Sequence, residues 1–276
     1  MLHQLWVAIA MCVLFGQAAH ADEPKRLLLI GQKPDGHPPG THEYMPGVRL
    51  LADTLAGVDG VKCQITQADD PWTDGPELLG RADGAVLFVS EGARWMHGDA
   101  KRIEAFEKLA ARGGGLVVLH WGMGTKDAAN IDRFVRLFGA CHGGPDRKFK
   151  VIADAEVRVA DPQHPVTRGI AGFQIQDEFY YRLKLVAADS SKAPPAAALA
   201  VQPLLQVPID GNLETVAWAW RRPDGGRSFG FSGLHFHSNW QRDECRRLVA
   251  QAALWTLALP VPENGLPLLN CTNRPL

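Results

Sequence analysis

The first half of the chain alternates short apolar runs with amphipathic stretches, and this order limits the fold more than any other feature. The runs RLLLIG from Arg26, VKCQITQ from Val61, AVLFVS over 85–90 and LVVLH ending at His120 are typical of buried strands. Between them, MPGVRLLADTLAG and DAKRIEAFEKLAARGGG place apolar residues at helical spacing, the second after Asp99 as the expected N-cap. Such alternation favours an α/β fold, a mostly parallel sheet with helices on both faces.

The second half of the chain is richer in strands. FKVIADAEVRVA, FYYRLKLV and TVAWAWRRPDGGRSFGFSGL are the expected strands. Pro223 to Gly226 is the expected turn of the third stretch, so we expect a β-hairpin added to the mostly parallel sheet. CRRLVAQAALWTLAL closes the pattern as an amphipathic helix. Because no linker interrupts the sequence, we expect one domain over residues 22–266 and a tail over 267–276.

The N-terminus has the pattern of a secretory signal peptide over residues 1–21. An apolar run from Leu5 to Phe15 precedes small residues and an Ala19-His20-Ala21 cleavage sequence. The run is shorter than the roughly 20 residues that span a bilayer. We therefore expect an exported protein, periplasmic or extracellular, without a membrane anchor after cleavage.

Charge and cysteine content narrow the function classes. The 29 Lys and Arg nearly balance the 30 Asp and Glu, and the basic residues do not cluster, so nucleic acid is not an expected partner. No CxxC spacing occurs among the four cysteines after the signal sequence, which excludes a zinc knuckle and leaves one disulfide or none; they are Cys63, Cys141, Cys245 and Cys271. A homo-oligomer is left open.

His120 stands where a buried strand runs into a glycine-rich turn, at the carboxyl edge of the predicted sheet. Related α/β architectures place an exposed nucleophile at this corner. Because neither Cys nor Ser occupies it, His120 is a catalytic or metal-binding candidate, and the neighbouring Trp121 is a candidate for the pocket wall. The alternative is that His120 only caps the strand by hydrogen bonding.

His235 and His237 follow the apolar run SFGFSGL. If the strand continues through them, both imidazoles point to one face, a spacing that suits two ligands of one divalent metal ion such as zinc. A structural, hydrogen-bonded pair is the alternative. Trp240, just after this pair, is a candidate sugar contact.

Two further groups carry carboxylates. Asp177 and Glu178 open the segment DEFYY, where either is a candidate general acid or base and Tyr180 a candidate substrate contact. His42 and Glu43 lie in the loop after the first strand and are candidate substrate ligands. A solvated strand start explains the first group equally well, and a helix cap explains the second.

The remaining histidines and tryptophans have plainer interpretations. His37, His97 and His142 lie in glycine-rich segments and are expected to be loop residues. Trp218 and Trp220 alternate on a predicted strand and are expected in the core.

The ordered motifs GTHEY, GGGLVVLHWG, DPQHPVTRGI, DEFYYRLKL and TVAWAWRRPDGGRSFGFSGLHFHSNW resemble the ThuA-like (trehalose utilisation) family, over about residues 25–266. The resemblance implies a class I glutamine amidotransferase-like, flavodoxin-type fold in which the catalytic Cys is replaced. It also implies a role in carbohydrate metabolism, beside sugar oxidoreductases that make keto sugars. Matched by motif, the implied site residues are His42, Glu43, His120, Asp177, Glu178, His235 and His237. Trp121 departs from the family pattern, which usually has a small residue there.

We therefore expect an exported enzyme acting on a small carbohydrate by isomerisation, elimination or hydrolysis. His235, His237 and His120 would hold a divalent metal, with Glu178 as the general base. The alternative is a non-catalytic carbohydrate-binding or accessory module. A cysteine amidohydrolase using Cys141 or Cys63 is disfavoured, because neither residue sits at the strand corner.

Overall fold

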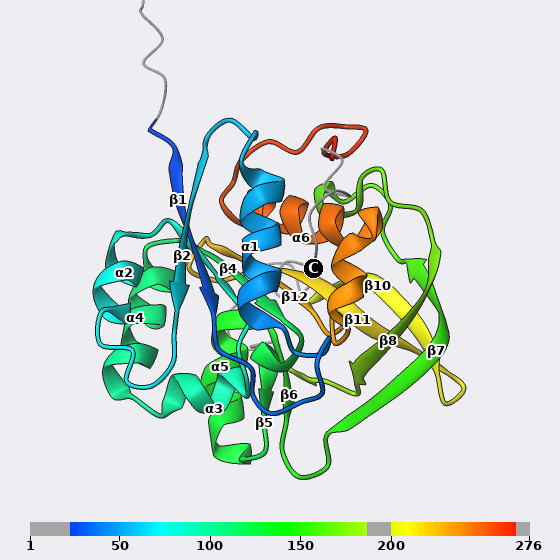
Figure 1. The fold of residues 1–276 in the computed structure, drawn as a ribbon, viewed down its shortest axis with the longest axis horizontal. Helices are drawn as coiled ribbons and strands as arrows, with labels where there is room; N and C mark the ends of the chain where they lie inside the picture. Colours follow the sequence, from blue (N-terminus) through cyan, green and yellow to red (C-terminus); the bar gives the residue numbers. More distant parts are fainter. Residues whose placement is uncertain (1–22, 187–199, 269–276) are drawn as a thin grey trace, which may run out of the picture.

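The computed structural model describes residues 23–186 and 200–268. The expected signal peptide and most of the expected tail lie outside these residues. The centre of the fold is a nine-stranded sheet of order β2-β1-β3-β4-β12-β11-β10-β7-β8 (Figure 1).

One half of the sheet is parallel, and its four neighbouring strand pairs all run in the same direction. Its strands are β1 (Lys25–Gly31), β2 (Val61–Gln67), β3 (Gly84–Leu87), β4 (Gly115–Leu119) and β12 (Arg227–Phe231). With β12 as the fifth strand, the order is the 2-1-3-4-5 arrangement of flavodoxin-like folds. Ligands bind such sheets beyond the carboxyl ends of the strands.

The other half is antiparallel and wider than a single added hairpin. It contains β7 (Lys148–Val159), β8 (Phe173–Tyr181), β10 (Gln202–Ile209) and β11 (Asn212–Arg221). The hairpin expected at residues 223–226 is confirmed, because Arg221 of β11 pairs with Arg227 of β12. The strand expected over FYYRLKLV instead ends at Tyr181, since Arg182 has a φ of 50°. A small sheet follows, with β5 (Gly124–Thr125), β6 (Ala140–Gly143) and β9 (Lys184–Leu185).

Helices cover both faces of the parallel half, which confirms the expected α/β class (Figure 1). Helices α1 (Tyr44–Leu55) and α6 (Asp243–Thr256) pack on one face. The other face carries α2 (Gly75–Arg81), α3 (Gly92–His97), α4 (Ala100–Ala111) and α5 (Ile131–Phe138). Short 3₁₀ helices are η1 (His120–Met123), η2 (Ala128–Asn130), η3 (Pro165–Thr167) and η5 (His237–Gln241).

Strand β1 shows why this arrangement forms. Its side chains alternate between the two faces, so that Leu27 and Leu29 join the core under α1 while Leu28 and Ile30 join the core under α4. Each is at most 1% exposed, and full burial of such a side chain contributes roughly 1.5–3 kcal/mol. An entirely apolar strand therefore needs a helical layer on each side.

Several local predictions are confirmed. The carboxylate of Asp99 accepts hydrogen bonds from the backbone N–H groups of Lys101 and Arg102 and caps α4. Trp218 and Trp220 lie in the core, at 0% and 3% exposure.

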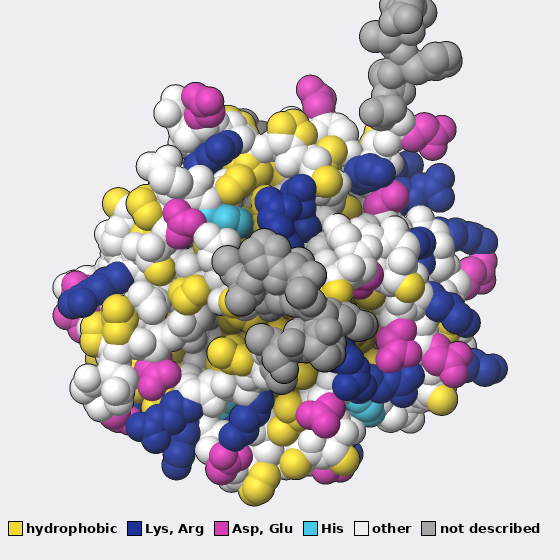
Figure 2. Space-filling view, turned by 180° about the vertical axis from the view of Figure 1, so that it is seen from behind, with side chains coloured by type: hydrophobic (Ala, Val, Ile, Leu, Met, Phe, Trp, Pro, Cys, Tyr) yellow, Lys and Arg dark blue, Asp and Glu magenta, His cyan; other side chains and the backbone are white. Residues whose placement is uncertain are grey.

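On the face turned toward the viewer in Figure 2, basic and acidic side chains are interspersed rather than grouped by sign. None of the helices in the described part of the chain has the length and apolar character needed to cross a membrane. The described cysteines Cys63, Cys141 and Cys245 are free thiols, and Cys271 lies outside the described residues.

Candidate functional site

Three loops meet at the carboxyl edge of the parallel strands, and two of them are bonded to each other. The loop after β1 and the loop after β12 form an isolated bridge between Thr41 and Phe236. The backbone N–H of His42 donates to the carbonyl of His235 at 3.1 Å, and that of His237 donates to Gly40 at 2.8 Å. This pairing fixes His42 beside His235.

The backbone is strained at each of these loops. His42, His120 and Leu234 have φ values of 53°, 44° and 76°, which residues other than glycine rarely adopt. Such conformations concentrate at functional sites, because the surrounding structure must hold them. The sharp turn expected at His120 is therefore present, and its backbone is strained.

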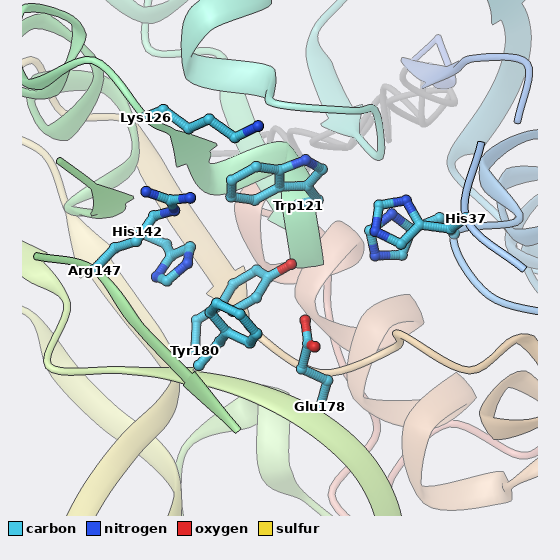
Figure 3. A pocket seen from close by; sticks show the side chains of 9 residues that line it. His37, Trp121, Lys126, His142, Arg147, Glu178 and Tyr180 are labelled. Atoms are coloured by element: carbon cyan, nitrogen blue, oxygen red, sulfur yellow. The ribbon is translucent and has the colours of Figure 1, made fainter. Parts of the chain in front are cut away.

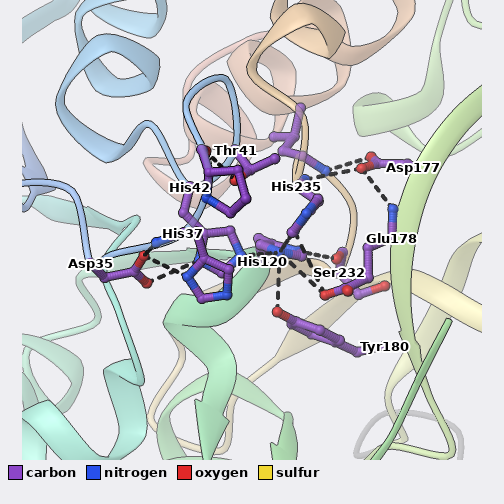
Figure 4. Close-up of polar contacts among 12 residues, drawn as sticks. Asp35, His37, Thr41, His42, His120, Asp177, Glu178, Tyr180, Ser232 and His235 are labelled. Atoms are coloured by element: carbon purple, nitrogen blue, oxygen red, sulfur yellow. Dashed lines mark hydrogen bonds and ion pairs between the residues drawn. The ribbon is translucent and has the colours of Figure 1, made fainter. Parts of the chain in front are cut away.

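Four side chains from these loops and from β8 form one compact cluster, which we call the His/Glu cluster; it comprises His42, His120, Glu178 and His235 (Figure 4). The Nε2 atoms of His42 and His120 lie 3.0 Å apart, and Nε2 of His120 lies 3.2 Å from Nδ1 of His235. Oε1 of Glu178 lies 3.8 Å from His120 and 3.7 Å from His235. All four ligand atoms lie within 4.8 Å of one another.

A hydrogen bond to the backbone of Ser232 shows which ring nitrogen of His120 carries the hydrogen. Nδ1 of His120 lies 2.7 Å from the carbonyl oxygen of Ser232, which can only accept, so Nδ1 carries a hydrogen. Burial, and then the neighbouring His42, hold the pKa of His120 well below its usual value. The ring is therefore neutral, and a lone pair on Nε2 points at the cluster.

His42 is oriented in the same way by a carboxylate. Its Nδ1 lies 3.0 Å from Oδ2 of Asp35, which also accepts from the hydroxyl of Tyr44 at 2.7 Å. Burial opposes ionisation of Asp35, but hydrogen bonds from His42, Tyr44 and His37 outweigh it and hold its pKa below the usual value. Because Asp35 is a carboxylate acceptor, His42 donates from Nδ1, and its Nε2 faces the cluster.

This geometry fits a metal ion. Two imidazole nitrogens that face each other at 3.0 Å need a proton or a cation between them. Tetrahedral zinc bonds of about 2.0–2.1 Å put neighbouring nitrogen ligands about 3.3 Å apart, close to the separations measured here. Histidine ligands whose second nitrogen donates to a carboxylate or carbonyl are also typical of metal centres. The buried His/Glu cluster can therefore hold a metal ion.

Glu178 and Tyr180 flank the cluster on neighbouring inward positions of β8. The Glu178 carboxylate lies farther from Nε2 of His120 than the ring nitrogens of His42 and His235 do, and burial raises the pKa of Glu178. The hydroxyl of Tyr180 lies 3.0 Å from Nε2 of His120, and its ring stacks on His120 with centroids 4.6 Å apart. Burial keeps the pKa of Tyr180 well above its usual value, so the hydroxyl keeps its proton as a donor.

Asp177 lies behind the cluster and holds the loop that carries His235. Its carboxylate accepts from the backbone N–H groups of Leu234 at 2.6 Å and of His235 at 3.0 Å (Figure 4). Complete burial raises the pKa of Asp177 to about 7, although these hydrogen bonds oppose the shift. The geometry makes Asp177 a positioning residue for His235 rather than a group that faces a ligand.

The expectation that His235 and His237 share one face of a strand is wrong. Strand β12 ends at Phe231, the chain turns at Leu234, and His237 begins the 3₁₀ helix η5. His237 is consequently not among the ligand groups that the described residues form.

Two other candidates also lie elsewhere. Trp240 is 1% exposed and packs against Phe88 in the core, with ring centroids 6.0 Å apart, so it is not available to a sugar. The carboxylate of Glu43 accepts from the backbone N–H of Gly40 at 3.1 Å and shapes the turn before α1, where it makes no side-chain capping bond.

A pocket of about 540 Å³, including its open mouth, adjoins the His/Glu cluster (Figure 3). The predicted substrate contacts His42, Trp121 and Tyr180 line it, as does the predicted catalytic residue Glu178. Sequence reasoning missed the other side chains of the wall, which are His37, Lys126, His142, Arg147 and Phe149. No local pattern in the sequence marks these five residues, because the pocket is assembled from distant segments.

The histidines expected in loops have mixed outcomes. His37 is a loop residue as expected, but His142 lies in β6 and His97 ends α3.

Neither cysteine considered as a nucleophile is suited to that role. Burial raises the pKa of Cys63 to about 11 and raises that of Cys141 further above its usual value. The Cys141 thiol donates to the carbonyl of Met123 at 3.2 Å, inside the core. Neither thiol lines the pocket.

The chain matches the ThuA family, described as trehalose utilisation, over residues 30–256. It is similar in structure to a ThuA-like protein from Bacteroides uniformis, with a TM-score of 0.62, 18% identity, and coverage of 87% of this chain and 95% of that one. It is also similar to part of Gan42B, a GH42 beta-galactosidase, with a TM-score of 0.53, 11% identity, and coverage of 86% of this chain and 30% of that one. No curated protein matches the chain in sequence. The extent of the family match shows that this chain belongs to the ThuA family.

Proposed function

We propose that this ThuA-family protein is an exported, metal-dependent enzyme that removes a proton next to the carbonyl group of a keto sugar, leading to isomerisation or elimination. The observation that carries the proposal is the close approach of the Nε2 atoms of His42 and His120, which face each other at 3.0 Å. Export rests on the N-terminal sequence, and the sugar substrate rests on the family.

The three imidazoles are the metal ligands in this proposal. Catalytic zinc sites keep three protein ligands and leave one position open to water or substrate. Nε2 of His120 lies 3.0 Å from the ring nitrogen of His42 and 3.2 Å from that of His235, whereas Oε1 of Glu178 lies 3.8 Å from it. A divalent metal bound there supplies Lewis-acid polarisation of a carbonyl oxygen.

Glu178 is the general base. A carboxylate whose pKa is raised by burial matches proton transfer near neutral pH better than an exposed one. Glu178 takes the proton from the carbon next to the carbonyl, and the electrons of the broken C–H bond move toward the carbonyl oxygen. Return of the proton to the former carbonyl carbon, with transfer of the hydroxyl proton of the neighbouring carbon to the former carbonyl oxygen, completes an isomerisation. Departure of a β-substituent, protonated by the Tyr180 hydroxyl, completes an elimination.

Metal analysis with a turnover assay tests the proposal. The purified protein should contain about one divalent ion per chain and should convert keto-disaccharides but not the unoxidised disaccharides. A chelator should abolish turnover, and added metal should restore it. Glu178→Gln should retain the metal and lose at least about 100-fold in kcat, whereas the exposed control Glu156→Gln should retain activity.

Two results would contradict the proposal. A protein without metal after purification and metal supplementation would remove the metal role of the His/Glu cluster. Saccharide binding without turnover of any keto sugar would favour the alternative, a carbohydrate-binding module.

A further inference from the structure

The pocket extends from the His/Glu cluster toward a second group of side chains, Lys126, His142 and Arg147. We call this group the cationic end, because Lys126 and Arg147 carry positive charge. Figure 3 shows these three on one side of the pocket and His37 on the other, with Trp121 and Tyr180 between them. Of the pocket-lining residues, Glu178 is the single acid, and it belongs to the cluster. The two ends of the pocket therefore differ in chemistry.

Arg147 is a guanidinium without an acidic partner among the described residues. It is half-buried, its Nη1 donates to the carbonyl of Gly144 at 3.2 Å, and it lies 6.0 Å from the ring centre of Trp121. None of the ion pairs formed by the described residues includes it. Placing a cation at a partly desolvated position is unfavourable unless an anion joins it.

Lys126 extends the positive charge along the same wall. Its Nζ lies 4.0 Å from the carboxylate of Glu91, the outer limit of an ion pair, and its side chain is 68% exposed. The ammonium group is therefore free to swing toward a ligand at the mouth of the pocket. Arg147 therefore offers a planar guanidinium that can donate two parallel hydrogen bonds, and Lys126 offers a flexible ammonium group.

His142 completes the cationic end with a neutral ring. It is 2% exposed and stacks on Tyr180, with ring centroids 3.9 Å apart and an interplanar angle of 6°. Burial, and then Arg147, lower its pKa to about 3. Neither ring nitrogen has a hydrogen-bond partner among the described residues, so His142 can bind a ligand hydroxyl beside the charged group.

We infer that the cationic end binds the carboxylate of an acidic sugar, so that the substrate of the proposed reaction is a keto sugar that also carries an acid group. The role of the acid sugar as the substrate rests on the proposed function, whereas its binding at the cationic end does not. Arginine matches a carboxylate through two parallel N–H···O bonds. The apolar face of the sugar then lies against Trp121 and Tyr180, and its carbonyl end faces the cluster.

Matched acids and amides test this inference by calorimetry. The probes are D-glucuronate with D-glucuronamide and D-gluconate with D-gluconamide, measured on both the metal-loaded and the chelator-treated protein. Each acid should bind at least about tenfold more tightly than its amide, as a charge-assisted hydrogen bond requires. The preference should persist without metal, which excludes binding of the carboxylate by the metal itself.

Substitutions assign the preference to Arg147. Arg147→Gln should bring the acid to the affinity of its amide, and Arg147→Lys should keep part of the preference. Arg158→Gln is the matched control, because Arg158 lies on β7, away from the pocket, and pairs with Glu156. Metal content should be unchanged in all three variants.

Equal binding of acid and amide to the wild-type protein, or no binding of either acid, would overturn the inference. An equal loss of acid and amide binding in Arg147→Gln would also overturn it. Failure of the proposed function is a separate outcome, seen as absent metal or absent turnover while the acid preference remains.

Discussion

Nε2 of His42 and Nε2 of His120 face each other at 3.0 Å, although each ring already donates from Nδ1. Asp35 accepts from His42, and the Ser232 carbonyl accepts from His120, so both Nδ1 hydrogens are already used and Nε2 of the neutral His120 ring has no hydrogen to offer His42. The arrangement is unfavourable for two neutral imidazoles alone and favourable around a cation. This relationship connects the fold of three loops to the proposed chemistry.

Replacing His235 and His237 separately should give different metal contents. His235→Ala removes a ligand and should weaken zinc binding by more than about 100-fold, beyond the roughly 10–100-fold loss typical when a residue that only orients a ligand is changed. His237→Ala should retain the metal, because the chain turns away from the cluster before that residue. Mass spectrometry of bound metal, with circular dichroism as the folding control, decides the question. Equal losses in both variants would restore the pair as joint ligands.

Asp35→Asn should weaken metal binding by about 10–100-fold without unfolding the protein. The amide cannot reproduce a carboxylate that accepts from His42, Tyr44 and His37 together. The tautomer of His42 is then no longer fixed. Competition with a chromogenic chelator measures the affinity, and the exposed Asp132→Asn is the control. Unchanged affinity in Asp35→Asn would show that Asp35 does not orient the ligand.

His164 should make the protein less stable as the pH falls below neutral. Its ring is buried against Trp255, and burial, the largest cause, lowers its pKa from 6.5 to about 4. Between these values the unfolded chain binds the proton and the folded chain does not, so the free energy of unfolding decreases from pH 6.5 toward pH 4. Above pH 6.5 this effect is absent.

The variant His164→Gln isolates this contribution. It should be less stable at neutral pH by about 1 kcal/mol, through loss of ring packing. Its free energy of unfolding should then fall less between pH 6.5 and 4 than that of the wild type. Urea unfolding at several pH values measures both curves, and parallel curves would contradict the assignment to His164.

Gly92→Ala should destabilise the fold by about 1–3 kcal/mol. A Cβ atom at Gly92 would overlap the backbone carbonyl of Gly122, two residues after His120, and a carbonyl held in a tight turn cannot move aside easily. Gly80→Ala is the matched control, because the space around its Cβ is open and alanine favours a helix. Thermal unfolding compares the two, and an unaffected Gly92→Ala would indicate that the turn adjusts freely.

Local patterns in the sequence were sufficient for the fold class and for much of the element order. The alternation of β1, α1, β2 and β4 depends on nearest-neighbour periodicity, and the hairpin between β11 and β12 depends on turn residues. The short helices α2, α3 and α5 were not anticipated, since 6 to 8 residues give little periodicity to detect. The extent of the antiparallel half was also missed, because pairing between distant strands leaves no local mark.

The sequence by itself determined an α/β chain with a histidine at the corner after β4 and a carboxylate pair on a later strand. Only the tertiary structure decided which of these groups meet. His42, His120 and His235 are separated by 78 and 115 residues and converge because parallel strands end at one edge. The same long-range packing removed His237 and Trp240 from the site and brought in Asp35, His142 and Arg147. Local spacing sets the direction of a side chain, whereas its neighbours are set by how distant segments pack.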